Sequence, residues 1–274
     1  MGEDRVVLEN IVKNYRYFTL RVDYAEFKKG LNLVIGSNGS GKSTILKIIA
    51  GFIWPSKGRV RVVLEGREYT PRESMKHVGY VAEDVIPPNI KVRELLEAFA
   101  PSSSTLEYLA GSLKLTEHLD KKYMELSAGL RKRVQIAIAL LKDPRLILFD
   151  EPFSNLDVSI IPAVKKLLEE LKSKAIVVVT SHIWVDMDVD TITILDQGRL
   201  LYHGDSSIVK QSILFDVEVE GEKTTVDLDS LNKIIHPVKI HRVKASDPVE
   251  AVLQAVRDKP SGSSYTTSTP TNSS

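Results

Sequence analysis

The stretch Gly36-Ser-Asn-Gly-Ser-Gly-Lys-Ser-Thr44 decides the fold class of this chain. A strand-like run, Leu31–Ile35, precedes it, and apolar residues at helical spacing follow it as far as Gly51. This order predicts a strand, a glycine-rich loop and a helix. Glycines let backbone amides turn toward phosphate groups, and a helix N-terminus adds positive potential there. The segment therefore predicts a phosphate-binding loop of the P-loop type.

The residues of this loop have distinct expected roles. Lys42 supplies a positive charge to the phosphates, and the Ser43 hydroxyl reaches Mg²⁺. The alternative, a glycine-rich turn without function, fits poorly with a complete match placed between a strand and a helix. By itself the loop predicts only a nucleotide-binding protein. The predicted nucleotide-binding residues are Gly36, Ser37, Asn38, Gly39, Ser40, Gly41, Lys42, Ser43 and Thr44.

A second motif consists of two acids at the end of an apolar run, Leu146-Ile-Leu-Phe-Asp150-Glu151. Strands of a parallel core carry their sites at the carboxyl edge, so both acids should lie beside the P-loop. Two carboxylates at the end of a buried strand are costly unless a cation lies nearby. We expect Asp150 to hold Mg²⁺ through water and Glu151 to orient and deprotonate an attacking water. The alternative is a solvated loop after a strand.

Composition limits the remaining classes of protein. The chain has 274 residues, 43% of them hydrophobic, and 37 Lys+Arg against 36 Asp+Glu, so no overall charge favours nucleic acid as a partner. It has no cysteine, which excludes disulfides and Cys-based metal sites. The N-terminal residues are charged and do not resemble a signal peptide. No apolar run approaches the roughly 20 residues that span a bilayer, so a membrane function would need another chain.

The patterns along the chain predict an α/β fold. Residues 5–9 and 20–27 alternate as antiparallel strands do, a hairpin is expected at 58–64, and a strand at 78–82. A helical segment over 91–123, broken at 101–104, comes next. Buried strands at 146–149 and 176–180 alternate with a helix at 158–171, which is typical of a parallel core.

The pattern changes after residue 210. Residues 214–220 alternate strictly as a half-buried strand does, and Asp247-Pro-Val-Glu250 is typical of a helix start that leads to a helix ending near residue 256. The last 16 residues contain 10 Ser or Thr and should be disordered. We therefore predict a core domain over 1–210 with a helical subdomain at about 84–130, a small α/β appendage over 211–258, and a disordered tail over 259–274.

In motif order, residues 5 to 210 resemble the ATP-binding cassette (ABC) family. The deciding element is Leu126-Ser-Ala-Gly-Leu130, which resembles the family's signature LSGGQ, with Ala128 and Leu130 departing from it. In the family, the residues at Ser127 and Gly129 bind the γ-phosphate held by the opposite subunit, which suits a helix N-terminus. The alternative, a serine that simply caps a helix, is common, but the position before Asp150 favours the signature.

Further elements also resemble those of the family. Ser154-Asn-Leu-Asp157 is similar to the D-loop, which touches the partner cassette, and Thr180-Ser-His182 to the switch whose histidine bonds the γ-phosphate. The resemblance assigns catalysis to Glu151, His182 and Lys42, and contacts in trans to Ser127, Ala128, Gly129 and Asp157. Tyr15 resembles the aromatic residue that stacks on adenine, and the nearby Tyr17 and Phe18 are alternatives.

Glu83 is a departure from the family pattern. It occupies the Q-loop position, where the family has a glutamine that reaches Mg²⁺ and the attacking water. Glutamate has the same length and adds a third carboxylate to Asp150 and Glu151. Two interpretations of Glu83 stay open: a residue beside the metal, together with Ser43 and Asp150, or a loop residue that points to solvent.

The resemblance implies an ATP hydrolase that uses Mg²⁺ and powers a membrane transporter. Each chain carries the P-loop half of one site and the signature half of another, so we expect two cassettes to form a homodimer around ATP. The implied partner is a separate transmembrane subunit, and the implied location is the cytoplasmic face of a membrane. A soluble ABC ATPase in an assembly process, such as iron–sulfur cluster assembly, is the alternative, and an ATP-gated binding module is a third. The short helical segment and small appendage resemble exporter-type cassettes.

Overall fold

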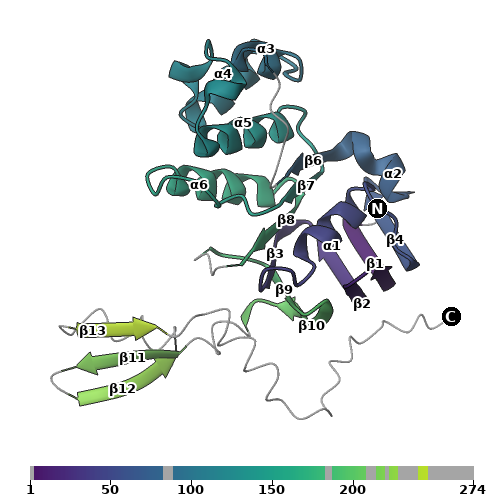
Figure 1. Cartoon of the computed structure of the whole chain (residues 1–274), viewed down its shortest axis with the longest axis vertical. Coiled ribbons are helices and arrows are strands. Elements are labelled where there is room, and N and C mark those ends of the chain that lie inside the picture. The colour runs from purple at the N-terminus through teal and green to yellow at the C-terminus, as the bar shows by residue number, and fades with distance from the viewer. Residues whose placement is uncertain are drawn as a thin grey trace. The chain divides into compact units, whose positions relative to one another are not determined.

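The computed structural model describes residues 3–82, 89–182 and 187–207 and the backbone of three further strands. The chain divides into two compact units, Met1–Ser206 and Ser207–Ser274, and each is described by itself. The predicted α/β fold is confirmed for the first unit, in which helices pack against one large mixed sheet (Figure 1). The predicted division into a core, an appendage and a tail at residues 210 and 258 stays a prediction.

The first unit is built on a ten-stranded sheet with the order β5-β4-β1-β2-β10-β9-β3-β8-β7-β6. The half from β9 to β6 is parallel. In the other half, neighbouring strands from β5 to β2 are antiparallel, and β10 pairs with β2 in parallel and with β9 in antiparallel orientation. The strands are β1 (Arg5–Asn14), β2 (Thr19–Lys28), β3 (Gly30–Gly36), β4 (Lys57–Leu64), β5 (Arg67–Tyr69), β6 (Val78–Val81), β7 (Leu146–Phe149), β8 (Ile176–Ser181), β9 (Thr191–Asp196) and β10 (Arg199–Asp205).

The parallel half positions the functional motifs. Every residue of β3, β7 and β8 is buried, as expected for parallel strands covered on both faces. Strand β3 lies between β8 and β9, and β7 lies between β8 and β6. The carboxyl ends of β3, β7 and β8 therefore meet at one edge of the sheet, and the P-loop, the two acids and His182 follow those ends directly.

Strands β9 and β10 are among the elements that the sequence interpretation did not include. They form a hairpin in which Arg199 pairs with Asp196, so its loop is Gln197-Gly198. Both loop residues have positive φ, 46° and 79°, the conformation of the type I′ turn that suits a hairpin. The alternating Thr191-Ile-Thr-Ile-Leu followed by this turn was the missed signal. The hairpin joins the two halves of the sheet, because β10 pairs with β2 and β9 pairs with β3.

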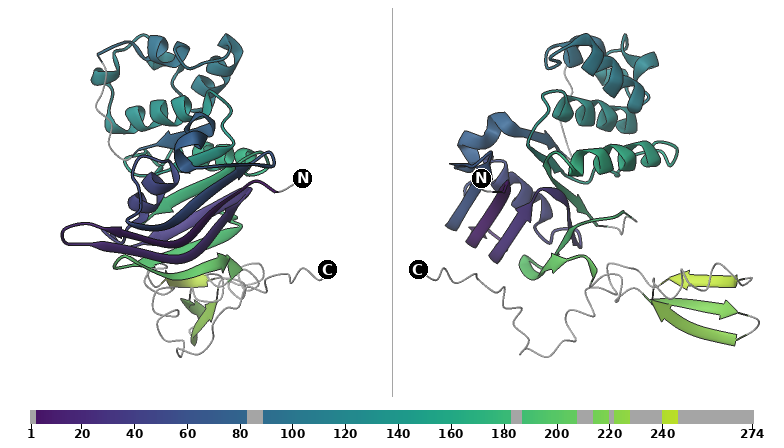
Figure 2. Two further views of the ribbon diagram at one scale, coloured as in Figure 1. Left: turned by 90° about the vertical axis from the view of Figure 1, so that its right-hand side faces the viewer. Right: turned by 180° about the vertical axis from the view of Figure 1, so that it is seen from behind.

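The helices form two groups. Helices α1 (Lys42–Ile49) and α6 (Ile161–Lys172) pack against the sheet, and a helical region at one end contains α3 (Val92–Glu97), α4 (Ser103–Ser112) and α5 (Ala128–Leu140) (Figures 1 and 2). A short helix, α2 (Pro71–Ser74), follows β5. The helical segment predicted over 91–123, with a break at 101–104, does form two helices, α3 and α4, but its predicted end is wrong: after α4 the chain forms only short 3₁₀ turns before α5. The helix predicted from residue 158 begins at Ile161, with proline in its first turn.

The second unit contains a three-stranded antiparallel sheet with the order β12-β11-β13. Its strands are β11 (Leu214–Val219), β12 (Glu222–Asp227) and β13 (Ile240–Ala245). The strand predicted over 214–220 corresponds to β11. The predicted helix ending near residue 256 and the predicted disordered tail lie outside the described residues. None of the helices in the described part of the chain combines the length and apolar composition that crossing a bilayer requires.

Candidate nucleotide-binding and catalytic site

A cavity of about 510 Å³ lies at the carboxyl edge of the parallel strands. Its walls come from the P-loop, the loop after β7, the end of β8 and the β1–β2 connection, segments far apart in the sequence. The structure thus brings together the motifs that the sequence placed at one edge. The lining residues are Phe18, Asn38, Gly39, Gly41, Lys42, Ser43, Thr44, Glu151, Ser154 and His182.

The P-loop backbone depends on glycine at two positions. Gly41 is the N-cap of α1 and has φ 108°, a conformation that residues with a side chain rarely adopt. At Gly36, a Cβ atom would lie 2.2 Å from the carbonyl oxygen of Leu195, so no side chain fits between β3 and β9. The loop can therefore wrap closely around a phosphate group, and loop residues together with the first turn of α1 line the cavity.

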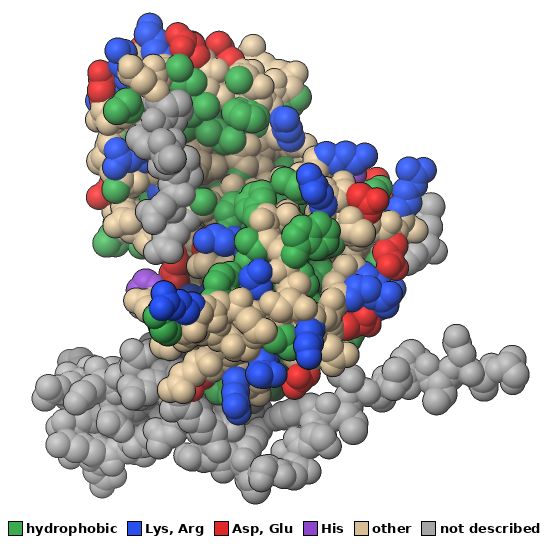
Figure 3. Space-filling model, turned by 45° about the vertical axis from the view of Figure 1, so that its right-hand side comes forward, with side chains coloured by type: hydrophobic (Ala, Val, Ile, Leu, Met, Phe, Trp, Pro, Cys, Tyr) green, Lys and Arg blue, Asp and Glu red, His purple; other side chains and the backbone are tan. Residues whose placement is uncertain are grey.

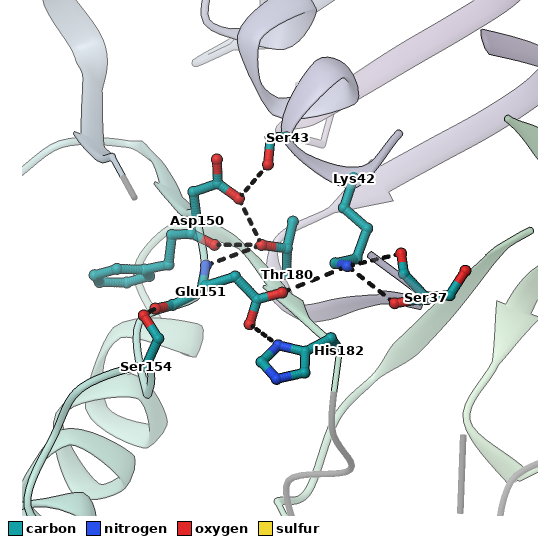
Figure 4. Close-up of polar contacts among 10 residues, drawn as sticks. Ser37, Lys42, Ser43, Asp150, Glu151, Ser154, Thr180 and His182 are labelled. Carbon is teal, nitrogen blue, oxygen red and sulfur yellow. Dashed lines mark hydrogen bonds and ion pairs between the residues drawn. The ribbon is translucent and has the colours of Figure 1, made fainter. Parts of the chain in front are cut away.

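Lys42 is buried at the base of the cavity, with 6% of its surface exposed. Its ammonium donates to the carbonyl oxygens of Gly36 (2.9 Å) and Ser37 (3.2 Å) and lies 3.5 Å from Oε1 of Glu151. These contacts hold the Lys42 side chain against the backbone of the P-loop (Figure 4). A phosphate group in the cavity would meet this fixed positive charge.

Asp150 is almost fully buried and is surrounded by hydroxyl groups. Its Oδ1 accepts hydrogen bonds from Ser43 (3.0 Å) and Thr180 (2.9 Å), and its Oδ2 accepts one from Tyr80 (3.4 Å). The Ser43 hydroxyl donates to Asp150 (Figure 4), so its oxygen can still offer a lone pair to a cation. Tyr80 and Thr180 are contacts of this acid that the sequence interpretation did not assign.

The carboxylate of Glu151 lies between the side chains of Lys42 and His182. Its Oε1 lies 3.5 Å from Lys42 Nζ, and its Oε2 lies 2.9 Å from Nδ1 of His182. Its backbone has φ 48°, in the left-handed region that non-glycine residues seldom occupy, and the residue is only 8% exposed. This turn directly after β7 aims the carboxylate into the cavity (Figure 4), where a water-activating base would have to be.

The predicted aromatic residue Tyr15 lies in the β1–β2 connection and is 46% exposed. Its ring centre is 6.2 Å from that of Phe18, and Lys13 Nζ lies 5.5 Å above its ring. Phe18 lines the cavity, whereas Tyr15 is not among the described lining residues. Stacking on adenine by Tyr15 stays a prediction, and the geometry adds weight to the alternative, Phe18.

The signature segment begins α5. Ser127 is the N-cap and its hydroxyl accepts the amide of Leu130 at 3.3 Å, while Ala128 is the first helical residue. Gly129 lies against the D-loop: a Cβ at this position would be 2.6 Å from the carbonyl oxygen of Asn155. None of the described residues that line the cavity belongs to this segment. The signature segment is thus separate from the cavity of its own chain, as expected if a second cassette supplies the signature residues.

Two basic residues after the signature are buried by the loops around the site. Lys132, 3% exposed, donates to the carbonyl oxygen of Ala82 at 2.9 Å, and Arg133, 7% exposed, donates to Asp157 at the same distance. Helix α5 thus holds the D-loop and the residue that precedes Glu83. Glu83 itself, predicted in the Q-loop position, lies outside the described residues.

Known proteins share these motifs. The family model "ABC transporter" matches residues 25–154. The Nod factor export ATP-binding protein I of Bradyrhizobium sp. (strain SNU001) is 30% identical over 222 residues, which cover 76% of this chain and 71% of that relative. The chain belongs to the ABC transporter ATP-binding family. Its members are the ATP-binding, ATP-hydrolysing subunits of transporters, and the family resemblance predicted from the sequence is confirmed.

Other relatives of this ABC cassette serve different transporters. The lantibiotic transport ATP-binding protein SrtF of Streptococcus pyogenes is 27% identical, over 79% of this chain and 98% of that relative. The molybdate/tungstate import ATP-binding protein WtpC of Pyrococcus horikoshii is 34% identical, over 72% and 61%. The export and import relatives are about equally similar, so these comparisons give no preference to the exporter type. All three are transporter subunits, which favours transport over a soluble assembly ATPase.

The solved structures agree on the fold of the ABC cassette. A bacterial Atm1-family ABC exporter with ATP bound matches with a TM-score of 0.66 at 26% identity, covering 75% of this chain and 39% of that chain. An ATP-binding subunit of an ABC transporter matches with a TM-score of 0.65 at 25% identity, covering 83% and 98%. The P-loop core inferred from Gly36–Thr44 is therefore the fold of these cassettes.

Proposed function

We propose that this cassette binds Mg-ATP in the cavity of its P-loop and hydrolyses it with Glu151 as the base. The observation that carries the proposal is the Glu151 carboxylate, held between Lys42 and His182 at the cavity wall. The P-loop amides and Lys42 bind the phosphates, and Glu151 orients and deprotonates the attacking water. His182 holds the Glu151 carboxylate on one side and can bond the γ-phosphate with its other ring nitrogen.

The residues near the P-loop fit Mg²⁺ as the ion that accompanies ATP. Mg²⁺ prefers oxygen donors and keeps several waters, and the Ser43 hydroxyl and the Asp150 carboxylate lie 3.0 Å apart in this structure. Ser43 would bind the ion directly and Asp150 through water. Held by these two residues, the ion would supply positive charge that neutralises the negative charge developing on the phosphates. Glu83 is the further candidate for this ion that the sequence suggested.

The partner that completes the site is proposed to be a second copy of this chain. Ser127, Ala128 and Gly129 would reach the γ-phosphate bound by the other cassette, and Asp157 would contact that cassette through the D-loop. One chain carries both halves of the site but not facing each other, so a head-to-tail homodimer would close two sites at once.

The transmembrane partner is proposed to be a separate chain that holds the cassette at the cytoplasmic face of a membrane. Figure 3 shows apolar side chains gathered between the helical region and the strands on one face of the first unit. Among the exposed aromatic residues are Phe52 and Trp54, at 50% and 58% exposure. Large exposed apolar groups that gather in one area are typical of interaction sites.

The test is Glu151→Gln, which keeps the shape of the side chain and removes its charge. We expect hydrolysis to fall at least about 100-fold, the scale of a lost general base, while ATP still binds and the variant accumulates as an ATP-bound dimer. Turnover measured by phosphate release, with dimerisation followed by gel filtration, checks both. Glu107→Gln, at an exposed position on α4, is the matched control and should leave turnover unchanged. Near-normal turnover of Glu151→Gln would assign the base to another residue.

A further inference from the structure

A single buried hydroxyl, that of Thr180, touches both acids of the site. Thr180 lies near the end of β8, next to β7, and is fully buried. Its Oγ1 is 2.9 Å from Oδ1 of Asp150 and accepts the backbone amide of Glu151 at 3.0 Å (Figure 4). The Asp150 carboxylate and the Glu151 backbone are thus connected through one atom of a neighbouring strand.

The proton of this hydroxyl has one favoured acceptor. Oγ1 lies 2.9 Å from the Asp150 carboxylate and 3.5 Å from the carbonyl oxygen of Phe149. The shorter bond goes to a carboxylate, and bonds to ionised acceptors are the stronger ones, so the proton points at Asp150. A lone pair of Oγ1 then remains for the Glu151 amide. The hydroxyl uses its donor on one acid and its acceptor on the other.

Thr180 contacts Glu151 at the point where the chain leaves β7. The Asp150 amide still bonds to Val81 of β6, as the parallel ladder continues, whereas the next amide, that of Glu151, turns to Thr180. At this turn Glu151 adopts φ 48°, which a residue with a side chain keeps only when its surroundings hold it. The same turn directs the carboxylate to Lys42 and His182.

We propose that Thr180 is a positioning residue for ATP hydrolysis, which sets the Asp150 carboxylate toward Ser43 and holds the left-handed turn of Glu151. It does not touch the reacting atoms and acts through the two acids. The inference rests on the proposed function, since it needs Glu151 as the base and Asp150 as the acid that holds the ion. A merely structural threonine would stabilise β8 without any effect specific to hydrolysis.

Three substitutions of Thr180 separate these roles. Thr180→Val keeps the shape and removes the hydroxyl, so kcat should fall about 10-fold or more, the usual effect of losing a group that orients a metal ligand or base. The KM for Mg-ATP should rise by no more than about 10-fold, because the P-loop is unchanged and only the contribution of Mg²⁺ to binding is weakened. Thr180→Ser and Thr180→Ala leave the same cavity from the lost methyl and differ by the hydroxyl alone. Their kcat values should differ about 10-fold or more, with Ser near wild type.

Thr193→Val is the matched control. Thr193 is also fully buried in the same sheet, in β9, but its hydroxyl bonds to His203 and not to an acid of the site. Removal of the Thr193 hydroxyl should lower the thermal denaturation temperature without changing kcat. If Thr180→Val does not fold, the Ser and Ala variants carry the test, with thermal denaturation measured for both.

A second readout does not depend on turnover. Calorimetric binding of a non-hydrolysable ATP analogue, without and with Mg²⁺, measures how much the ion tightens binding. In Thr180→Val that gain should shrink about 10-fold, because Asp150 loses the hydroxyl that orients it. Binding without Mg²⁺ should stay within about 3-fold of wild type.

The proposal is overturned if the Ser and Ala variants differ less than 10-fold in kcat, or if Thr193→Val lowers kcat as much as Thr180→Val. It is also overturned if Thr180→Val lowers the residual rate of a Glu151→Gln enzyme by the full factor seen in wild type while the Mg²⁺-dependent gain in analogue binding is unchanged, since neither acid would then carry the effect. Failure of the proposed function is distinguishable. In that case Glu151→Gln itself leaves turnover intact.

Discussion

Gly129→Ala should affect the stability of the protein in two opposite ways: through a higher helix propensity and through a steric clash. Gly129 lies in the first turn of α5 with ordinary helical backbone, so alanine alone would gain up to about 1 kcal/mol from helix propensity. The added Cβ, however, would lie 2.6 Å from the carbonyl oxygen of Asn155, about 0.8 Å short of ordinary van der Waals contact. That oxygen belongs to the backbone, so no flexible side chain can move away.

The expected change in the free energy of unfolding combines the gain in helix propensity with the cost of the steric clash. Overpacking of this kind costs about 1–3 kcal/mol, so the net change in free energy of unfolding should be a loss of about 0–2 kcal/mol. Activity should fall as well, because relief of the contact moves the D-loop against the signature. We expect kcat to fall at least about 10-fold, the scale on which displaced positioning groups act.

Gly111→Ala is the matched control, since Gly111 is also helical, in α4, and its added Cβ would meet nothing within 4 Å. It should stabilise the protein by about 0.5–1 kcal/mol and leave turnover unchanged. Urea denaturation gives both stabilities, and phosphate release at saturating Mg-ATP gives both rates. The reasoning is refuted if Gly129→Ala is as stable and as active as Gly111→Ala.

Three other outcomes can be checked with standard assays. Lys42→Ala should lose nucleotide affinity in calorimetry, because a charge on the phosphates is removed; unchanged binding would exclude its P-loop role. A mixture of Glu151→Gln and Ser127→Arg subunits should be more active than either parent, since one shared site escapes both changes; no recovery would contradict sites in trans. Burial lowers the pKa of His203, despite opposing contacts with Glu26, so the neutral ring is favoured in the folded state. Its contribution to stability should be present above about pH 6.5 and decline as pH falls toward the lower folded pKa, a decline absent from His203→Gln in pH-dependent denaturation.

The local part of the site could be predicted because it depends on contiguous residues. The P-loop is one segment, and its strand, glycines and helix follow from spacing and φ preference. The two acids could be placed beside it because parallel strands end at one edge. The hairpin at Gln197-Gly198 was also readable, from alternation and a turn that favours positive φ.

The contacts that shape the site could not be predicted in the same way. Thr180 meets Asp150 and Glu151 across 30 and 29 residues, and Tyr80 meets Asp150 across 70. No local propensity favours a left-handed glutamate, and the hydroxyl that receives its amide lies on the next strand. Periodicity reports which face is buried, and it does not report which buried polar groups pair.

Helix α5 shows the consequence for function. Arg131-Lys-Arg133 directly follows the signature in the sequence, and charged residues on a helix are usually solvated. Lys132 and Arg133 are instead buried, each with a partner in a loop at the site: the carbonyl of Ala82 before the Q-loop position, and Asp157 in the D-loop. A buried cation needs such partners, so the two loops and the signature are held by one rigid element. Any movement of α5 must therefore move or break both contacts together.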